Sequence, residues 1–229
     1  MKTASKTYYR RNLPHWHPDG AAFFVTWRLH GSLPRSSIEQ IEARRNLLRR
    51  EAMRKNETTQ ERNLRHDKKL FAMIDEILDK TDRGPLWLKQ PPIADLIEEA
   101  LLNRYAELYR LWAYVVMANH VHVLLQPKLV QTDDSAAEPG YIPLEEITKR
   151  LKGYTAREAN KMLRRTGNPF WQVESYDHWE RDEAEFYRIV SYIENNPVKA
   201  GLALRPEDWK WSSARERLRR GWTEIRALT

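Results

Sequence analysis

The stretch AYVVMANHVHVLL, residues 113–125, decides the fold of this chain, because it reads as two buried strands joined by a short turn. A continuous apolar run of this kind is typical of buried strands, in which successive side chains alternate between the two faces of a sheet. We expect strands at about 110–116 and 121–126, with Met117-Ala118-Asn119 as the turn between them. Strands joined by so short a turn pair in an antiparallel direction.

Two histidines, His120 and His122, lie inside this run. Their spacing places both imidazoles on the same face of the sheet, roughly 7 Å apart along the strand. Two imidazoles on one face can chelate a divalent metal, while Val121 points the other way into the core. A second interpretation is that both are polar residues on the solvated face of an edge strand, and the spacing alone leaves this open.

The composition restricts the classes of protein that the chain can belong to. With 229 residues, 41% of them hydrophobic, the chain can build one large domain or two small ones. Its net charge of +7 favours an anionic partner. Alternatively, the charge only keeps the protein in solution. The absence of cysteine excludes disulfides, thiolate catalysis and cysteine-ligated zinc. Without a long apolar segment or a signal peptide, we expect a soluble cytosolic protein and no membrane partner.

The segments around the strand pair predict the rest of the fold. We expect a strand at 21–29, two charged helices over about 36–80 with a weak break near 56–59, and helices over 93–109, 144–165 and 182–196. Residues 131–141 read as a loop. This order suggests an α+β fold with a central antiparallel sheet and helices on one face. We interpret residues 1–229 as a single domain with a charged helical insertion at about 36–80.

The helix predicted over 182–196 carries a second pair of polar residues. Asp182 is a suitable N-cap, and the Asn195-Asn196-Pro197 sequence should end the helix, because a residue before proline avoids the helical conformation. Tyr192 and Asn196 are four residues apart and therefore lie on one side of the helix. They could meet the two histidines across a shallow cleft. Alternatively, Asn196 caps the helix end and Tyr192 packs at its margin.

Several motifs resemble those of one family. Residues 192–201, YIENNPVKAG, closely resemble a signature of the REP-associated tyrosine transposases, and so do MANHVH (117–122), RRNLPHW (10–16), FVTWRL (24–29) and DWKWSS (208–213). These motifs occur in the right order from about residue 8 to residue 213. The family belongs to the histidine–hydrophobic–histidine (HUH) group of single-strand DNA endonucleases, related to small single-tyrosine insertion-sequence transposases. The resemblance implies a ferredoxin- or RRM-like sheet.

The resemblance also implies a site and a reaction. His120, His122 and Asn196 would ligate a divalent metal, Mg²⁺ or Mn²⁺, and Tyr192 would be the nucleophile. The activity would be metal-dependent cleavage and transfer of single-stranded DNA through a covalent 5′-phosphotyrosine. The substrate would be hairpin DNA of the REP type, and the protein would act as a monomer or homodimer in the cytoplasm, associated with the nucleoid. The long charged stretch near 36–80 departs from compact members of the family.

Basic residues should bind the DNA backbone with salt-sensitive affinity. The helix predicted over 144–165 carries seven of them against three acidic residues: Lys149, Arg150, Lys152, Arg157, Lys161, Arg164 and Arg165.

Three alternatives remain open at this point. Tyr154, with Glu158 four residues later, competes with Tyr192 as nucleophile, and Tyr176 lies in a stretch that reads as extended. The chain could instead be a catalytically inactive nucleic-acid-binding module on the same fold. A metal hydrolase that uses the histidine pair and an activated water is the third possibility, and it would form no covalent adduct.

Overall fold

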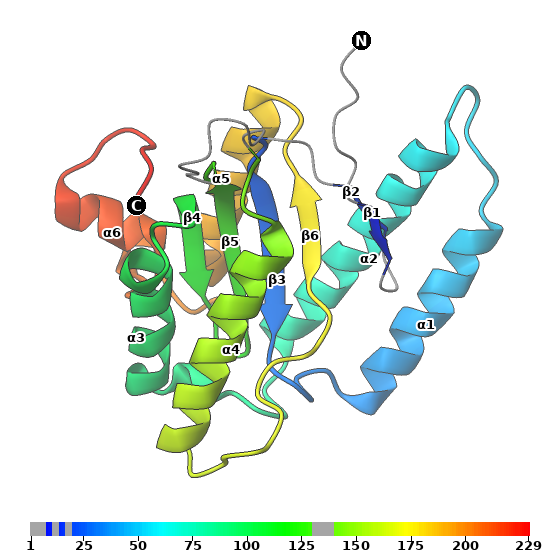
Figure 1. Cartoon of the computed structure of the whole chain (residues 1–229). Helices are drawn as coiled ribbons and strands as arrows, with labels where there is room; N and C mark the ends of the chain where they lie inside the picture. Colours follow the sequence, from blue (N-terminus) through cyan, green and yellow to red (C-terminus); the bar gives the residue numbers. More distant parts are fainter. Residues whose placement is uncertain (1–7, 11–13, 17–19, 130–139) are drawn as a thin grey trace. The chain divides into compact units, whose positions relative to one another are not determined.

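The computed structural model of the chain describes residues 8–10, 14–16, 20–129 and 140–229 (Figure 1). The loop expected at 131–141 falls almost entirely outside these residues. The chain divides into two compact units, of which the first comprises Met1–His30 and Trp87–Thr229 and the second comprises Gly31–Leu86. The second unit contains the predicted helical insertion at about 36–80, while the assignment of a single domain stays a prediction.

The first unit is built on a four-stranded sheet with the order β4-β5-β3-β6. Its strands are β3 (Phe23–Arg28), β4 (Tyr109–Val116), β5 (His120–Pro127) and β6 (Tyr176–Trp179). All neighbouring strands are antiparallel, and the first of these strands in the chain, β3, lies between the third and the fourth. This is the ferredoxin-like order, so the predicted α+β class is confirmed. Two short strands, β1 (Tyr8–Arg10) and β2 (Pro14–Trp16), form a separate antiparallel pair.

The strand pair predicted from residues 113–125 is the centre of this sheet. Strands β4 and β5 pair through Val115 with His122 and Val116 with Val121. The backbone N–H of Met117 donates to the carbonyl oxygen of His120 at 2.9 Å and closes the turn. Both predicted strands are confirmed, and β5 begins at His120 itself, so both histidines belong to the strand.

One face of the sheet carries the main hydrophobic core. Here α3 (Pro91–Glu99), the short π-helical segment η2 (Ala100–Arg104) and α4 (Leu144–Met162) cover the sheet, and α3 and α4 stand in front of it in Figure 1. Ile97 of α3 and Ile147 of α4 are fully buried together with Val121 and Val123 of β5. The odd-numbered residues of β5 therefore face this core, as the alternation of a strand requires.

The opposite face is also covered, which corrects the expectation of helices on one face. Helix α5 (Glu183–Lys199) lies behind the sheet in Figure 1, and its Tyr192 ring contacts the rings of Phe24 and His122. A sheet buried on both faces needs apolar residues on both sides of its strands, which explains the continuous apolar run of β5. The remaining elements of this unit are η1 (Trp87–Lys89), η3 (Pro206–Asp208) and α6 (Ser213–Arg220).

Strand β6 and two helix ends differ from the sequence expectation. Tyr176 lies in a stretch that reads as extended, and the structure contains a fourth strand there, Tyr176–Trp179, which at four residues is too short to give a periodic pattern. The helix expected to reach residue 109 ends at Arg104, and Tyr109 already starts β4. Helix α4 ends at Met162 rather than at 165, because Arg164 adopts a left-handed φ of 54° and Arg165 N–H donates back to the Asn160 carbonyl oxygen.

The end of α5 is the most consequential difference. Asp182 caps the helix as expected by accepting a hydrogen bond from the Glu185 N–H. The expected stop at Asn196 is wrong, because the helix continues through Pro197 to Lys199. A proline in the last turn forfeits one backbone hydrogen bond, and the carbonyl oxygen of Pro197 itself accepts from Leu202 N–H at 2.8 Å. Gly201, with a φ of 70°, then ends the segment.

The second unit contains two helices, α1 (Arg35–Arg50) and α2 (Thr59–Lys80), separated near the predicted break. Thr58 and Glu61 form a capping box that starts α2, in which each side chain binds the backbone N–H of the other. Leu33, Ile41 and Leu78 form a small buried cluster. Across the described residues of the whole chain, no helix is long and apolar enough to span a membrane.

Candidate metal and nucleophile site

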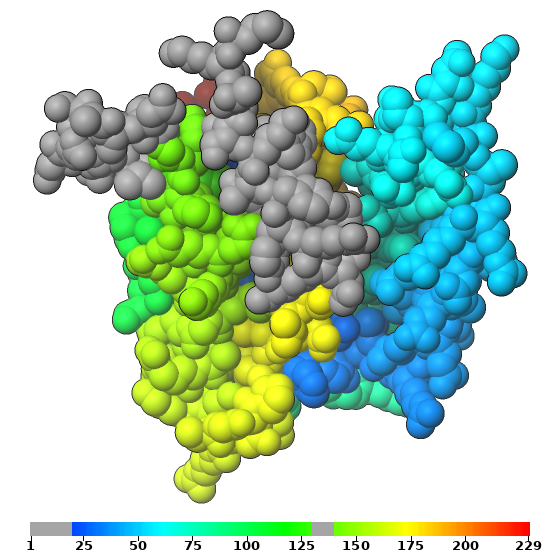
Figure 2. All heavy atoms as spheres, turned by 45° about the vertical axis from the view of Figure 1, so that its right-hand side comes forward, coloured from blue at the N-terminus to red at the C-terminus, as the bar shows by residue number. Residues whose placement is uncertain are grey.

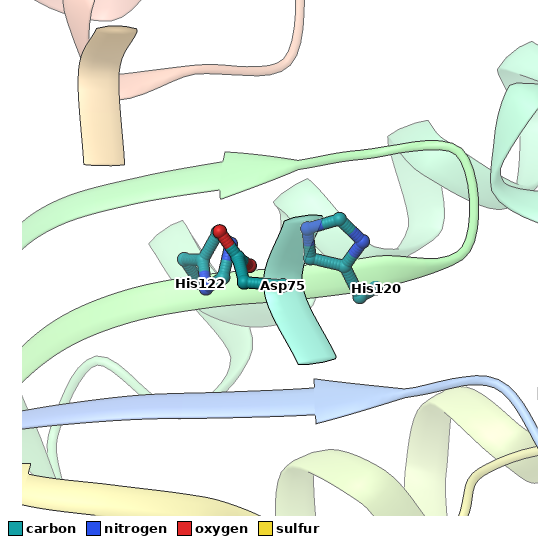
Figure 3. A group of neighbouring side chains, drawn as sticks. All are labelled: Asp75, His120 and His122. Atoms are coloured by element: carbon teal, nitrogen blue, oxygen red, sulfur yellow. The ribbon is translucent and has the colours of Figure 1, made fainter. Parts of the chain in front are cut away.

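The histidine pair lies on the face of the sheet that α5 covers. His120 and His122 are both fully buried, with ring centroids 4.6 Å apart and ring planes inclined by 73°. Each offers a ring nitrogen within 4.8 Å of the other, which is close enough for one cation to reach both. Figure 3 shows the two imidazoles projecting from β5.

A hydrogen bond fixes the proton of His120. Its Nδ1 lies 2.7 Å from the side-chain oxygen Oδ1 of Asn119, which is itself buried. An amide oxygen can only accept a hydrogen bond, so Nδ1 carries the proton and Nε2 keeps the lone pair that a metal needs. The residue expected only to form the turn therefore sets the tautomer of the first histidine.

His122 is held by a hydrogen bond from the neighbouring strand. Its Nδ1 lies 2.6 Å from the hydroxyl oxygen of Thr26, which is the direct cross-strand partner of His122 on β3. A histidine that binds a metal is usually oriented by a hydrogen bond at the ring nitrogen that does not bind the metal. On the other side of the ring, Nε2 of His122 lies 3.4 Å from the amide nitrogen of Asn196.

Asn196 provides the observation that tests whether a metal fits here. The residue is fully buried, and its Oδ1 has no hydrogen-bond partner among the described residues. The two ends of an amide have nearly the same shape, so a half-turn of the side chain brings Oδ1 to the place now held by the nitrogen, beside His122. Two imidazole nitrogens and one amide oxygen suit Mn²⁺ and can also hold Mg²⁺. The residues present therefore fit a divalent cation.

Tyr192 lies directly beside this group. Its half-buried ring is 5.8 Å from the ring of His122, centroid to centroid, at an angle of 66°, and 5.8 Å from that of Phe24. The Nζ atom of Lys199 is 5.6 Å from the centre of the Tyr192 ring. The structure thus brings together all four residues for which the sequence predicted chemistry, His120, His122, Tyr192 and Asn196.

Of the two competing tyrosines, one lies on the other face of the sheet and one shares the face of the histidines. Tyr154 is on α4, on the other face of the sheet, where its ring packs under the guanidinium of Arg104 at 3.9 Å. Tyr176 is the β6 partner of Thr26 and shares the face of the histidines, with its ring 6.1 Å from that of Phe24. Among the described residues, Tyr192 is the candidate nucleophile whose ring contacts a histidine of the pair.

The basic residues predicted to bind DNA are separated from the histidine pair by the sheet. Helix α4 packs on the core face through Ile147 and Leu151, and its outer surface is open in the space-filling view (Figure 2, yellow-green). Five of the seven side chains are exposed there or just beyond the helix end: Lys149, Arg150, Arg157, Lys161 and Arg164. This surface therefore lies on the opposite side of the sheet from Tyr192.

The other two basic residues have structural roles. The Lys152 ammonium donates to the carbonyl oxygens of Gln172 and Val173 and to the hydroxyl of Ser175, at 2.9 to 3.0 Å. These contacts use all three of its donors. Arg165 is half-buried, with its guanidinium 4.4 Å from the centre of the Trp87 ring. The proposal of DNA binding therefore rests on the five exposed residues.

Four residues near the site were missed by the sequence reasoning as functional groups. Thr26 and Asn119 orient the histidines, Lys199 approaches Tyr192, and Arg28 is the cross-strand partner of His120. Burial lowers the pKa of the Arg28 guanidinium. The available signal was alternation: Thr26 and Arg28 are polar residues at every second position of an otherwise apolar strand, so they share one face.

Two comparisons with known proteins, one of sequence and one of structure, match the same kind of protein. No family model matches the chain. A protein of Haemophilus influenzae, which carries the provisional name of a REP-associated tyrosine transposase, is 31% identical over 104 residues. This alignment covers 44% of the chain and 56% of the relative, so the chain matches only about half the length of that protein. A solved structure of a REP-associated tyrosine transposase bound to a REP hairpin superposes with a TM-score of 0.51 at 16% identity.

That superposition covers 97% of this chain and 93% of the other and therefore shows a common fold. Fold and site define the class as a ferredoxin-like α+β protein with an HUH-like histidine pair. More narrowly, the chain is similar to the REP-associated tyrosine transposases that these two comparisons name, in sequence over 104 residues and in fold.

Proposed function

We propose that the protein is a metal-dependent endonuclease and strand transferase that acts on single-stranded DNA next to REP-type hairpins. The observation that carries this proposal is the contact between Tyr192 on α5 and His122 on β5. In this contact the phenol lies beside the histidine pair, and the Nδ1 atom of each imidazole already forms a hydrogen bond. A nucleophile and a cation site that adjoin in this way are what phosphodiester cleavage requires.

The metal would be held by His120, His122 and Asn196. When bound, a Mg²⁺ or Mn²⁺ ion supplies Lewis acidity toward a nonbridging phosphate oxygen. Asn119 and Thr26 keep the two imidazoles in the orientation that presents Nε2 to the site. Because Thr26 belongs to the buried sheet and Asn119 is a buried residue of the β4–β5 turn, the ligands are preorganised and lose little freedom on binding.

The reaction of the chain itself takes place at Tyr192. Its hydroxyl oxygen attacks the phosphorus atom of the DNA backbone, the phenol proton passes to solvent, and a new P–O bond forms. The bond from phosphorus to the 3′ oxygen breaks, and that oxygen takes a proton to become a free 3′-hydroxyl. The 5′-phosphotyrosine keeps the free energy of the phosphodiester, so a second 3′-hydroxyl can be joined without ATP.

The nature of the substrate is supported by charge and by the relative of known structure. The net charge of +7 and the exposed basic residues of α4 favour a polyanion. The solved relative is bound to a REP hairpin. We therefore propose a substrate with a duplex stem and an adjoining single strand, in which the single strand reaches Tyr192.

The test is a labelled oligonucleotide with a hairpin and a single-stranded flank, incubated with Mn²⁺ and separated on a denaturing gel. A 3′ label should move with the protein, because the 3′ fragment carries the 5′-phosphate that becomes attached to tyrosine. A 5′ label should appear on a shorter, free strand that a polymerase can extend. Binding without any cleavage would indicate the inactive module, and cleavage without a protein-linked fragment would indicate a hydrolase.

Variants separate the metal site from DNA binding. His120→Ala and Asn196→Ala should abolish metal-dependent cleavage and retain most of the affinity for DNA, because they remove ligands and not backbone contacts. His30→Ala is the matched control, since His30 is exposed and lies just after β3. Equal activity of His120→Ala and His30→Ala would contradict the assignment of the metal site.

A further inference from the structure

A shallow pocket lies on the outer surface of α5, beside the proposed nucleophile. It is lined by Tyr187, Arg188, Ser191, Tyr192, Asn195 and Lys199. Among these described residues, two are cationic and none carries a carboxylate. A pocket with this lining attracts anions.

The continuation of α5 through Pro197 creates this arrangement. Arg188 precedes Tyr192 by four residues and Lys199 follows it by seven, so both lie on the side of the helix that carries Tyr192. Lys199 Nζ is 5.6 Å from the centre of the Tyr192 ring. If the helix ended at Asn196, Lys199 would have no defined place relative to Tyr192. The chain thus has a cation on each side of the phenol along the helix axis.

The pocket also presents an aromatic surface and a polar wall. The Tyr187 side chain is 50% exposed, which is unusual for a large ring and leaves much of it accessible to a ligand. The side-chain nitrogen of Asn195 donates to the carbonyl oxygen of Ser191 at 2.8 Å and thereby holds the amide against the helix. Cations for phosphates and an exposed ring for bases are the two elements by which proteins bind single-stranded nucleic acid.

We propose that this pocket is a subsite for the single-stranded nucleotides that flank the scissile phosphate. Arg188 and Lys199 bind the phosphates on either side of the phosphate that Tyr192 attacks, and the Tyr187 ring stacks on one of the bases. This inference rests on the proposed function, since it assumes that Tyr192 meets the scissile phosphate. It adds how the strand is held along α5.

The first test measures binding in the absence of metal and of chemistry. A fluorescent single-stranded oligonucleotide is titrated with Arg188→Gln and Lys199→Gln in the presence of a chelator, at several salt concentrations. Loss of one phosphate contact should reduce the slope of log affinity against log salt by about 0.7 for a single strand, and by twice that in the double variant. Lys89→Gln is the matched control, because Lys89 is an exposed residue of η1, which packs beside α3.

The second test addresses stacking. Tyr187→Ala should weaken the binding of the single strand at least about fivefold, whereas Tyr187→Phe keeps the ring and should bind as the wild type does. Under cleavage conditions, the Arg188 and Lys199 variants should raise the DNA concentration for half-maximal adduct formation more than they lower the maximal rate.

The outcomes separate the two proposals. If the wild type forms the tyrosine adduct but all variants keep its affinity and salt slope, the subsite is wrong and the proposed function stands. If the variants lose affinity as predicted but the wild type forms no adduct, the pocket binds single-stranded DNA, whereas the proposed chemistry at Tyr192 is wrong. An equal effect of Lys89→Gln would overturn the subsite, because the loss would then reflect net charge alone.

Discussion

The hydroxyl oxygen of Thr26 lies 2.6 Å from Nδ1 of His122, across the β3–β5 pair. The bond joins two strands that are distant in sequence and next to each other in the sheet. It leaves Nε2 of His122 on the side of Asn196, where a third ligand is available. The rigidity of the sheet, rather than of a loop, therefore sets the orientation of the proposed metal ligand.

Replacing this hydroxyl should weaken the metal site. Thr26→Val keeps the shape and the β-branch but removes the hydrogen bond, so the affinity for Mn²⁺ should fall about 10- to 100-fold. Thr26→Ser keeps the hydroxyl and should retain most of the affinity. Calorimetric titration with Mn²⁺ measures both. Equal affinities of the Val and Ser variants would show that Thr26 does not orient His122.

Two glycine substitutions should change stability in opposite directions. Gly201 has a φ of 70°, which an L-residue adopts at a cost, so Gly201→Ala should lower the free energy of unfolding by about 1–2 kcal/mol. Gly153 lies inside α4, and apart from its own stretch of helix backbone no described atom comes within 4 Å of an added Cβ, so Gly153→Ala should raise it by about 0.5–1 kcal/mol. Urea unfolding measures both. The same sign for the two variants would contradict the described backbone.

The packing of α4 on the sheet gives a third prediction. Ile147 is fully buried in the core that it shares with Val121 and Val123. Ile147→Ala should cost about 2–5 kcal/mol of stability, and Ile147→Val about 0.5–1.5 kcal/mol. The measurement is the denaturant midpoint, followed through tryptophan fluorescence. A cost below 1 kcal/mol for the Ala variant would show that α4 does not pack there.

The second unit should lose stability in acid. Hydrogen bonds from Lys69 and Arg65 lower the pKa of the Glu51 carboxyl from about 4.5 to about 2. A carboxyl whose pKa is lowered by folding stabilises the folded state above the unfolded pKa, and this contribution is lost as the pH falls from about 4.5 to about 2. Hydrogen exchange of the α2 amides over this range should show the loss.

Lys69→Gln and Glu51→Gln serve as controls for that titration. Both should weaken the dependence of α2 protection on pH, because each removes one partner of the ion pair. An unchanged pH dependence in Glu51→Gln would assign the acid sensitivity to other groups.

The sequence predicted the sheet and the identity of the site residues better than their surroundings. The apolar run around His120 and His122 gave both strands to within about one residue, because buried strands leave a strong local pattern. The cover of α5 on the second face could not be predicted from periodicity, since a strand buried on both faces shows no alternation. The order of β3 between β5 and β6 is likewise a matter of tertiary pairing.

The ends of two helices, α4 and α5, were not predicted correctly from local sequence signals. Pro197 predicted the end of α5, but near a C-terminus a proline costs one hydrogen bond, and tertiary packing outweighs that cost. Helices commonly end at a glycine in the left-handed conformation, but at the end of α4 this conformation is adopted by Arg164. The sequence therefore contains no glycine there that would mark the helix end. The pairs Thr26–His122 and Asn119–His120 depend on side-chain geometry that becomes visible only in three dimensions.

The central claim is that Tyr192 becomes covalently joined to DNA. Trypsin would separate Tyr192 from the competing Tyr154 and Tyr176 and from Tyr187, because these four tyrosines lie on different peptides bounded by lysine or arginine. The direct measurement is therefore mass spectrometry of the adduct after nuclease trimming and tryptic digestion. We predict a nucleotide remnant on the peptide of residues 189–199 and its absence in Tyr192→Phe, with Tyr154→Phe and Tyr176→Phe unaffected. A remnant on any other peptide, or an adduct that persists in Tyr192→Phe, would contradict the account.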